Sequence, residues 1–248
     1  MDTEAVRVRD LEKHFGRFVA VNRISFQVAT GEIFGFLGPN GAGKSTTIRM
    51  LCGIISPSGG SGRVAGLDIL HQSEEIKQTI GYMSQKFSLY LDMTPLENIR
   101  FYLGIYNVAE DSWPDRTRWV LDVTRLEDVR DRLTRDLPPG WRQRLALGCA
   151  LLHRPRIIFL DEPTSGVDPI TRRHFWDFIK QLAGGGMTVF VTTHYMDEAE
   201  HCDRAVVINE GRIVAQGPPA RIVADACPGK PDADLNDAFI QLVGRRTA

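Results

Sequence analysis

The sequence predicts an α/β fold with a parallel-sheet core, an antiparallel β edge and an inserted α-helical subdomain. Three observations support this prediction. Apolar and polar residues alternate along residues 6–28, as in antiparallel strands with one buried face. Residues 157–160 form a continuous apolar run, as in a strand covered on both faces. Between them, residues 94–153 carry helical patterning without strands, which indicates a helical insertion into an alternating β/α chain.

Size and charge limit the classes of function. The length of 248 residues suits one large domain, or a core with one inserted subdomain. Lys and Arg number 30 and Asp and Glu number 31, which gives a formal net charge of −1. We therefore expect no nucleic-acid partner, because such proteins usually carry a basic excess. No run approaches the roughly 18 apolar residues of a membrane span, so any role at a membrane is expected to depend on a partner.

The N-terminus and the cysteines favour a cytosolic protein. Residues 1–4 are acidic and lack an apolar h-region, so we expect no signal peptide. The cysteines, Cys52, Cys149, Cys202 and Cys227, are far apart and include no C-x-x-C pair. Because Cys52 and Cys149 lie in apolar helical stretches, reduced core thiols are favoured over a metal site or a disulfide scaffold.

The strongest motif is residues 38–45, GPNGAGKS, which fit the phosphate-loop pattern G-x-x-x-x-G-K-[ST]. The glycines allow backbone N–H groups to form an anion-binding concavity, and Lys44 adds a charge for the terminal phosphates. The Ser45 hydroxyl can serve as one Mg²⁺ ligand. A dinucleotide-binding loop is excluded because Thr46 stands where that pattern needs a third glycine. The predicted phosphate-binding residues are Gly38, Pro39, Asn40, Gly41, Ala42, Gly43, Lys44, Ser45 and Thr46.

The first half of the expected core is built around this loop. Residues 32–37 are predicted to form a buried strand that enters the loop, and residues 46–51 a helix that leaves it, with its N-terminus toward the phosphates. A Pro/Gly/Ser-rich loop follows at residues 53–62, then short strands at 63–65 and 80–84. Gln85 lies at the end of the last of these strands.

The helical insertion is expected to span residues 86–154. Thr94, Pro95 and Glu97 combine an N-cap, a proline at N1 and an acid at N3, which predicts a helix start. Helices are expected at residues 95–106, 115–123 and 142–152, and Pro155 ends the insertion.

The core is then expected to resume, so that residues 1–85 and 155–217 form one α/β unit. Strands are predicted at residues 156–160, 187–193 and 204–208, with a hairpin at 209–211. Asp168 and Pro169 begin a helix that reaches residue 182. Residues 218–248 are expected to form a short helical extension.

Chemically informative side chains follow the predicted strands. Asp161 lies just past a buried strand, where a Mg²⁺-bound water needs an acceptor, and Glu162 could act as a general base toward water. His194 and Gln85 also end strands, although either residue alone could be only a satisfied polar group. Phe15, at a turn, is a core residue or an adenine-stacking platform.

Together these motifs resemble the ATPase subunit of ABC transporters, in the family's order, over roughly residues 4–217. The resemblance implies a P-loop NTPase (RecA-like) fold that binds ATP and Mg²⁺. Residues 38–45 resemble Walker A, Gln85 the Q-loop, 157–162 Walker B with its catalytic Glu162, 165–168 the D-loop and His194 the switch histidine. Phe15 stands at the position of the adenine-stacking aromatic. Residues 161–169 and 193–200 most resemble bacterial exporters of drug, polysaccharide or antibiotic-resistance type.

The resemblance also implies partners. ATPase subunits of this family form a head-to-tail homo- or heterodimer, in which ATP lies between one Walker A loop and the other chain's signature loop. On this basis Ser45, Gln85 and Asp161 arrange the metal, His194 contacts the γ-phosphate, and Asp168 bridges the subunits. Residues 86–106 would dock a transmembrane permease subunit, and the chain would be cytoplasmic at the inner face of the membrane.

The sequence departs from the family at the signature. Where the family has L-S-G-G-Q, this chain has Leu137-Pro138-Pro139-Gly140-Trp141. Pro138 removes a hydroxyl and Pro139 removes a backbone N–H, and the loss of one donor to a developing charge typically costs about 10²–10³ in rate. Either turnover is slow and a partner completes the second site, or Gly140 and the helix end suffice. Trp141 is expected to pack beneath the loop rather than stack at an interface.

Two rival functions remain at this point. One is a non-transport ABC ATPase acting on macromolecules, although the basic surface, coiled-coil insert or second ATPase domain usual in that group is not found in this sequence. The other is an ATP-gated dimerisation clamp with weak hydrolysis. The Pro138-Pro139 pair favours the clamp, whereas Asp161, Glu162 and His194 favour hydrolysis.

Overall fold

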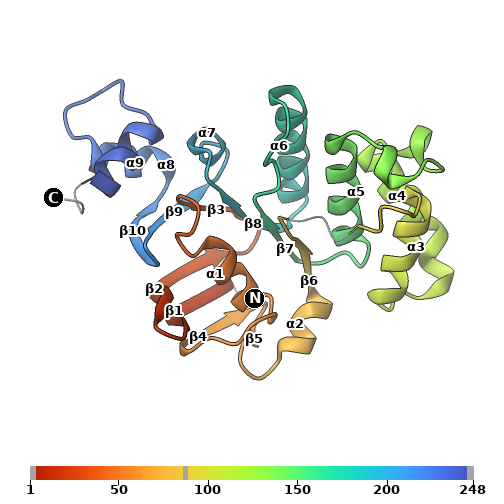
Figure 1. Ribbon diagram of the computed structural model, residues 1–248, viewed down its shortest axis with the longest axis horizontal. Coiled ribbons are helices and arrows are strands. Elements are labelled where there is room, and N and C mark those ends of the chain that lie inside the picture. Colours follow the sequence, from red (N-terminus) through yellow and green to blue (C-terminus); the bar gives the residue numbers. More distant parts are fainter. Residues whose placement is uncertain (1–3, 86–88, 245–248) are drawn as a thin grey trace.

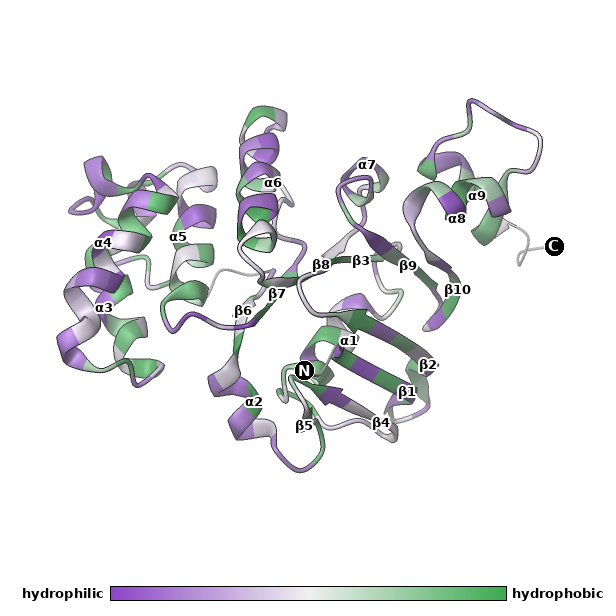
Figure 2. Cartoon of the chain, turned by 180° about the vertical axis from the view of Figure 1, so that it is seen from behind, coloured by the Kyte–Doolittle hydropathy of each residue, from purple (hydrophilic) through white to green (hydrophobic). Residues whose placement is uncertain are grey.

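The protein, described here by a computed structural model of residues 4–85 and 89–244, contains two β-sheets with helices around them (Figure 1). The first sheet is antiparallel, with strand order β2-β1-β4-β5. Along β1 and β2, apolar and polar residues alternate (Figure 2), which is why one face of this sheet is buried. Its strands are β1 (Glu4–Phe15), β2 (Phe18–Ala29), β4 (Gly59–Val64) and β5 (Leu67–Asp68).

The second sheet is the parallel core that the sequence predicts. Its strand order is β10-β9-β3-β8-β7-β6, and each neighbouring pair from β9 to β6 is parallel, while β10 pairs antiparallel with β9. The carboxyl ends of β3, β6, β7 and β8 therefore meet at one edge, where ligands bind in such folds. The strands are β3 (Ile33–Leu37), β6 (Ile80–Met83), β7 (Ile157–Asp161), β8 (Thr188–Thr193), β9 (Arg204–Asn209) and β10 (Arg212–Gly217).

Helix α1 (Lys44–Leu51) contacts strands of both sheets, β7 of the core and β2 and β4 of the antiparallel sheet. An aromatic cluster joins the sheets beside it. Phe26 of β2 lies 5.6, 5.4 and 6.1 Å, between ring centroids, from Phe34, Phe36 and Phe190 of the core sheet. Buried aromatic pairs at these distances contribute beyond their area, so this cluster fixes the antiparallel sheet against the strand that leads into the phosphate loop.

Three helices form a helical block: α3 (Pro95–Ile105), α4 (Trp113–Thr124) and α5 (Pro139–Leu151). Helix α3 begins with the predicted cap, a reciprocal capping box of Thr94 and Glu97. The block has its own apolar cluster, which includes Ile99, Leu103, Val120 and Leu145. The boundary predicted at residue 86 falls within 86–88, outside the described residues. Three short 3₁₀ turns, Glu110–Ser112, Glu127–Val129 and Thr134–Asp136, connect the block.

The remaining helices each contact a strand of the core sheet. Helix α6 has apolar and polar residues in alternation along its length (Figure 2). Its buried residues Phe175, Trp176 and Ile179 share an apolar cluster with residues of β3, β7 and β8. The remaining helices are α2 (Ser73–Thr79), α6 (Pro169–Gly184), α7 (Met196–Ala199), α8 (Pro219–Ala226) and α9 (Leu235–Gly244). Within the described part of the chain, no helix is both long and apolar enough to cross a membrane.

The loop expected at residues 53–62 is shorter than expected, because its last four residues belong to β4 (Gly59–Val64). The start of α5 was also predicted wrongly. The sequence analysis expected a helix from residue 142, but α5 begins at Pro139, so Gly140 lies inside its first turn rather than in a loop. Proline is tolerated at the first helical position because its missing N–H has no intrahelical partner there. Helix α2 and strand β5 were also not predicted, because both are short and carry weak periodicity.

Candidate active site

The phosphate loop joins β3 to α1, and its shape depends on close backbone approach. Gly43 is the N-cap of α1 with φ 105°, and a Cβ there would lie 2.5 Å from the Ala20 carbonyl oxygen. A Cβ on Gly38 would lie 2.2 Å from the Ile208 carbonyl oxygen. Only glycine fits these two positions. The N-terminus of α1 is thereby aimed into the loop, as an anion site requires.

Asp161, the last residue of β7, is held by two hydroxyls. Its Oδ1 accepts hydrogen bonds from Ser45 Oγ at 3.0 Å and Thr192 Oγ1 at 2.7 Å. Burial, and then the nearby Glu162 charge, raise the pKa of Asp161, against the lowering effect of the two hydroxyls. Its Oδ2 is buried without a hydrogen-bond partner among the described residues. Such an orphaned oxygen beside a serine hydroxyl fits a Mg²⁺ ion or one of its waters.

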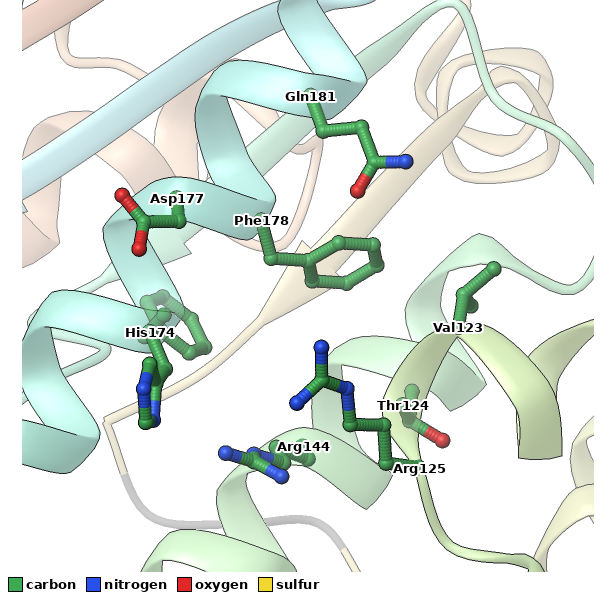
Figure 3. A pocket seen from close by; sticks show the side chains of 9 residues that line it. Val123, Thr124, Arg125, Arg144, His174, Asp177, Phe178 and Gln181 are labelled. Atoms are coloured by element: carbon green, nitrogen blue, oxygen red, sulfur yellow. The ribbon is translucent and has the colours of Figure 1, made fainter.

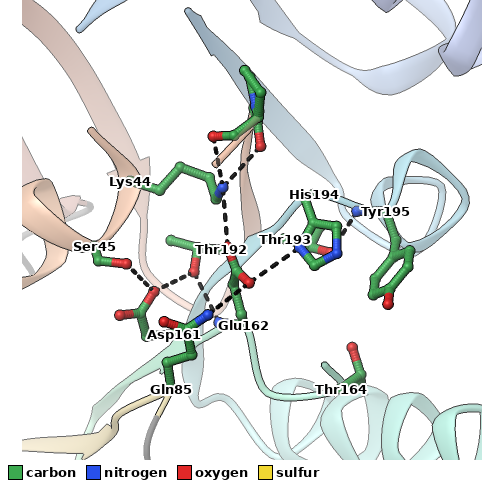
Figure 4. Close-up of polar contacts among 12 residues, drawn as sticks. Lys44, Ser45, Gln85, Asp161, Glu162, Thr164, Thr192, Thr193, His194 and Tyr195 are labelled. Atoms are coloured by element: carbon green, nitrogen blue, oxygen red, sulfur yellow. Dashed lines mark hydrogen bonds and ion pairs between the residues drawn. The ribbon is translucent and has the colours of Figure 1, made fainter. Parts of the chain in front are cut away.

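Glu162 lies at the centre of a buried polar network (Figure 4). Its Oε1 is 3.0 Å from Lys44 Nζ, and both side chains are about 95% or more buried. Its Oε2 accepts a hydrogen bond from Gln85 Nε2 at 3.1 Å and lies 3.1 Å from His194 Nδ1. Since an ionised carboxylate only accepts, Nδ1 carries the proton and His194 Nε2 is left for another partner.

Lys44 is shared between this carboxylate and the loop itself. Its Nζ also donates to the Gly38 carbonyl at 2.8 Å and the Pro39 carbonyl at 3.1 Å. Three oxygens therefore surround a cation that is 3% exposed. A phosphate oxygen can replace them, because an ammonium group has three donors and no fixed geometry.

A cavity of about 330 Å³ opens beside this network. Phe15 and Phe18, from the turn between β1 and β2, line it and are 51% and 63% exposed. Such exposed aromatic rings are suited to stacking a base. The cavity is also lined by Ala20, Asn40, Gly41, Gly43, Lys44, Ser45, Thr46, Gln85 and Glu162. Three of the predicted loop residues do not line the cavity. Ala42 is buried, and the carbonyl oxygens of Gly38 and Pro39 accept hydrogen bonds from Lys44.

Two predicted site residues lie apart from the cavity. Asp168 is exposed and is the N-cap of α6, where its side chain accepts from the Thr171 N–H at 3.0 Å. Gly140 lies at the start of α5, where a Cβ would be 2.6 Å from Thr171 Cγ2. Trp141 packs against the apolar cluster of the helical block, as the sequence analysis expected.

Two residues that contribute to the site, Thr192 and Phe18, were not predicted from the sequence. Thr192 bonds Asp161 and also accepts from the Glu162 N–H at 2.9 Å, so one hydroxyl positions both carboxylates. Its only signal was a hydroxyl residue near a strand end, two positions before His194. Phe18 carried a clearer signal, a second aromatic beside the turn that contains Phe15.

The fold and the site define the class: a phosphate-loop nucleotide-binding protein with paired acidic residues at the end of a neighbouring strand. The sequence profile of the ABC transporter family matches residues 21–165, more than half of the chain. The chain therefore belongs to the ABC transporter family.

Curated relatives agree with the profile. The chain is 45% identical over 239 residues to a probable multidrug ABC transporter ATP-binding protein, YbhF, of Escherichia coli, a match that covers 96% of this chain and 41% of that protein. It is 36% identical over 244 residues to the linearmycin resistance ATP-binding protein LnrL of Bacillus subtilis, covering 96% and 78%. The chain thus spans about two fifths of the length of the first relative.

Solved structures show the same fold. A structure of the ATP binding subunit of an ABC transporter superposes with a TM-score of 0.85 at 27% identity, covering 96% of this chain and 99% of that chain. A dimeric ATP-binding cassette in a post-hydrolysis state, bound to ADP and Pi, superposes with a TM-score of 0.78 at 25% identity, covering 86% and 98%. The chain is an ATP-binding cassette in fold.

Proposed function

We propose that this chain is the ATP-binding and ATP-hydrolysing subunit of an ABC exporter. One observation carries the proposal: Lys44, Gln85 and His194, from three different segments, all contact Glu162 beside the phosphate-loop cavity. A structural ion pair would not need a histidine and an amide from two other strand ends on the same carboxylate. A general base for water does need such positioning.

The proposed roles follow from the contacts. Lys44 and the loop amides of residues 38–46 bind the phosphates, with Phe15 against the base. Ser45, Gln85 and Asp161 hold Mg²⁺, which neutralises phosphate charge when bound. When Lys44 moves from Glu162 to a phosphate oxygen, Glu162 Oε1 becomes free to accept a proton from water. His194 Nε2 is available to the γ-phosphate.

We further propose that two cassettes close head to tail around ATP. Gly140 and Asp168 lie away from the chain's own cavity, which fits contacts made with a second copy or a related subunit. The similar cassette bound to ADP and Pi is dimeric. ATP that contacts both halves only in the closed dimer would shift the population toward closure, and hydrolysis would release it.

The relatives support a transport role. One is named for a multidrug transporter and another for linearmycin resistance, so we propose transmembrane permease subunits as partners and a cytoplasmic position at the membrane. Residues 1–85 and 155–217 would form the ATP-binding unit. Residues 86–154 would rotate as the helical subdomain that meets the permease through residues 86–106, and 218–248 would be an extension.

The test is the ATP hydrolysis rate of the purified chain as a function of its concentration, with Glu162→Gln as the blank. We expect activity per chain to rise with concentration, because two chains complete each site, and to fall by about 10²–10⁴ in the blank. ATP binding without activity above the blank would contradict hydrolysis by this chain alone.

A second candidate function, an ATP-gated clamp with weak turnover, rests on Pro138 and Pro139. Helix α5 has Pro138 as its N-cap and no side-chain cap. The Trp141 and Arg142 N–H groups donate to the Pro138 carbonyl, which leaves the Gly140 N–H as the free amide of the first turn among the described residues. Closure that is driven by ATP but followed by no phosphate release would identify the clamp.

A further inference from the structure

A second pocket lies between the helical block and α6, apart from the phosphate-loop cavity (Figure 3). Thr124 and Arg125 at the end of α4, and Arg144 of α5, line one side, and His174 and Phe178 of α6 line the other. Its volume is about 160 Å³, half that of the cavity beside the phosphate loop. The space holds a small ion with a few waters but not a whole nucleotide.

Two guanidinium groups share this pocket without a counter-charge. Arg125 and Arg144 reach from the helical block into the space beneath α6 (Figure 3). Within the described residues, neither group has a side-chain hydrogen bond, and no carboxylate lies within 4.0 Å of either, although other arginines of the chain form such pairs. The one acidic side chain that lines the pocket, Asp177, points away from both (Figure 3).

The local electrostatics are unfavourable without an anion. Burial, and then the positive charge of Arg125, lower the pKa of Arg144. Arg144 is partly buried, so its guanidinium loses some of its hydration, whereas Arg125 is exposed and keeps its own. An anion that bridges the two groups would remove both penalties.

The helices are packed so that the two arginines stay together. Helices α4 and α5 approach closely at Gly148, where a Cβ would lie 2.7 Å from Val120 Cγ1 and 2.9 Å from Thr124 Cγ2. Arg144 is one helical turn before Gly148 on the same face of α5. Arg125 follows Thr124 directly and ends α4 with φ 56°, a left-handed conformation that favours glycine or asparagine. The chain thus has a guanidinium at a position where glycine would be the easier residue.

We propose that this pocket binds a small oxyanion of the phosphate type. Two guanidinium groups balance the charge of a dianion, and a tetrahedral group has enough oxygens to accept hydrogen bonds from both N–H forks at once. The His174 ring and the Gln181 amide line the α6 side. A bound anion would join α4 and α5 to α6, the helix that Asp168 caps, and would stiffen the helical block against the core.

The test is the thermal unfolding midpoint of the full chain in inorganic phosphate, compared with chloride at equal ionic strength. Each comparison is made with a non-hydrolysable ATP analogue, which fills the phosphate loop, and is repeated without the analogue. We expect the midpoint to rise by roughly 3–6 °C at a phosphate concentration ten times the dissociation constant. The rise should disappear in Arg125→Gly, which suits the left-handed backbone and so should fold.

Arg154→Gly is the matched control. Arg154 is an exposed arginine with φ 54° after α5, and it does not line the pocket. It should keep the full rise. An equal rise in Arg125→Gly and Arg154→Gly would overturn the proposal, as would no rise in the parent chain. A rise seen only without the analogue would assign phosphate to the phosphate loop instead, and would also overturn it.

Discussion

The proposed nucleotide site has a phosphate end, around Lys44 and Glu162, and a signature end, around Pro138 and Pro139. The two ends differ in how complete they are within one chain. At the phosphate end, Lys44 and Glu162 are buried, and Glu162 contacts Lys44, Gln85 and His194. At the signature end, Pro138 and Pro139 are exposed, and within residues 4–85 and 89–244 the Gly140 N–H of the first turn of α5 has no hydrogen-bond partner. The phosphate end is preorganised by folding, whereas the signature end would complete a site only together with the partner subunit proposed above.

This difference separates effects on stability from effects on turnover. Substitutions at the phosphate end remove a member of a buried network, so they should change the free energy of unfolding as well as chemistry. Substitutions of Pro138 and Pro139 at the signature end touch few buried groups, so they should change turnover with little effect on folding. The predictions below test this separation, in order of decreasing expected effect.

The largest effect is expected for Lys44→Ala. This substitution leaves Glu162 buried without its cation, and such a change typically lowers the free energy of unfolding by about 3–5 kcal/mol. Denaturant unfolding would measure the loss, and adding Glu162→Gln should recover most of it because the unpaired charge is then gone. Lys77→Ala is the control: its partner Glu74 is 80% exposed, so the cost should stay below about 1 kcal/mol. Equal costs for the two lysines would show that the phosphate end is not preorganised.

The signature end is tested by Pro138→Ser combined with Pro139→Gly. The change adds a hydroxyl and a backbone N–H that would face the γ-phosphate of ATP bound by the proposed partner subunit. We expect turnover to rise by up to about 10²-fold with little change in the free energy of unfolding. The same double change at Pro218 and Pro219, the equivalent N-cap and first residue of α8, should leave turnover unchanged. An unaltered rate in the first variant would mean that Gly140 and the helix end already suffice.

The same contrast explains what the sequence could predict. The phosphate loop was predictable because its glycines and Lys44 act through local backbone geometry, which eight consecutive residues specify. Thr192 was not, because its contact with Asp161 depends on the register that pairs these two residues across β7 and β8. The Arg125 and Arg144 pair was also hidden, since it requires the close approach of α4 and α5 at Gly148.

A smaller effect is expected where α5 meets α6. Gly140→Ala places a methyl 2.6 Å from Thr171 Cγ2, and overpacking of this kind typically costs about 1–3 kcal/mol. Gly104→Ala in α3 has open space around it, so it should instead stabilise by about 0.5–1 kcal/mol. Thermal unfolding would measure both. Thr171→Ser removes the clashing methyl and should restore Gly140→Ala; if it does not, the loss has another origin.

The smallest effect is a pH dependence with opposite signs at two carboxyls. Burial raises the pKa of Asp161 above the ordinary value for an aspartate, so the stabilising contribution of its carboxyl is present below that ordinary value and is lost as pH rises through the folded-state pKa. Asp161→Asn should therefore unfold at a higher temperature than the parent chain at pH 7, with the gain vanishing in acid.

Asp168 gives the contrasting case. Hydrogen bonds from Thr171, first from its side chain and then from its backbone, lower the pKa of Asp168, so its contribution is present above the unfolded value and is lost as pH falls through the folded-state pKa. Asp168→Asn should thus lower the unfolding temperature slightly at pH 7 and match the parent chain in acid. If both variants shifted stability in the same direction, burial could not be what distinguishes Asp161. A stabilised Asp161→Asn that no longer hydrolyses ATP would show that the phosphate end holds its metal-side carboxylate at a cost in stability.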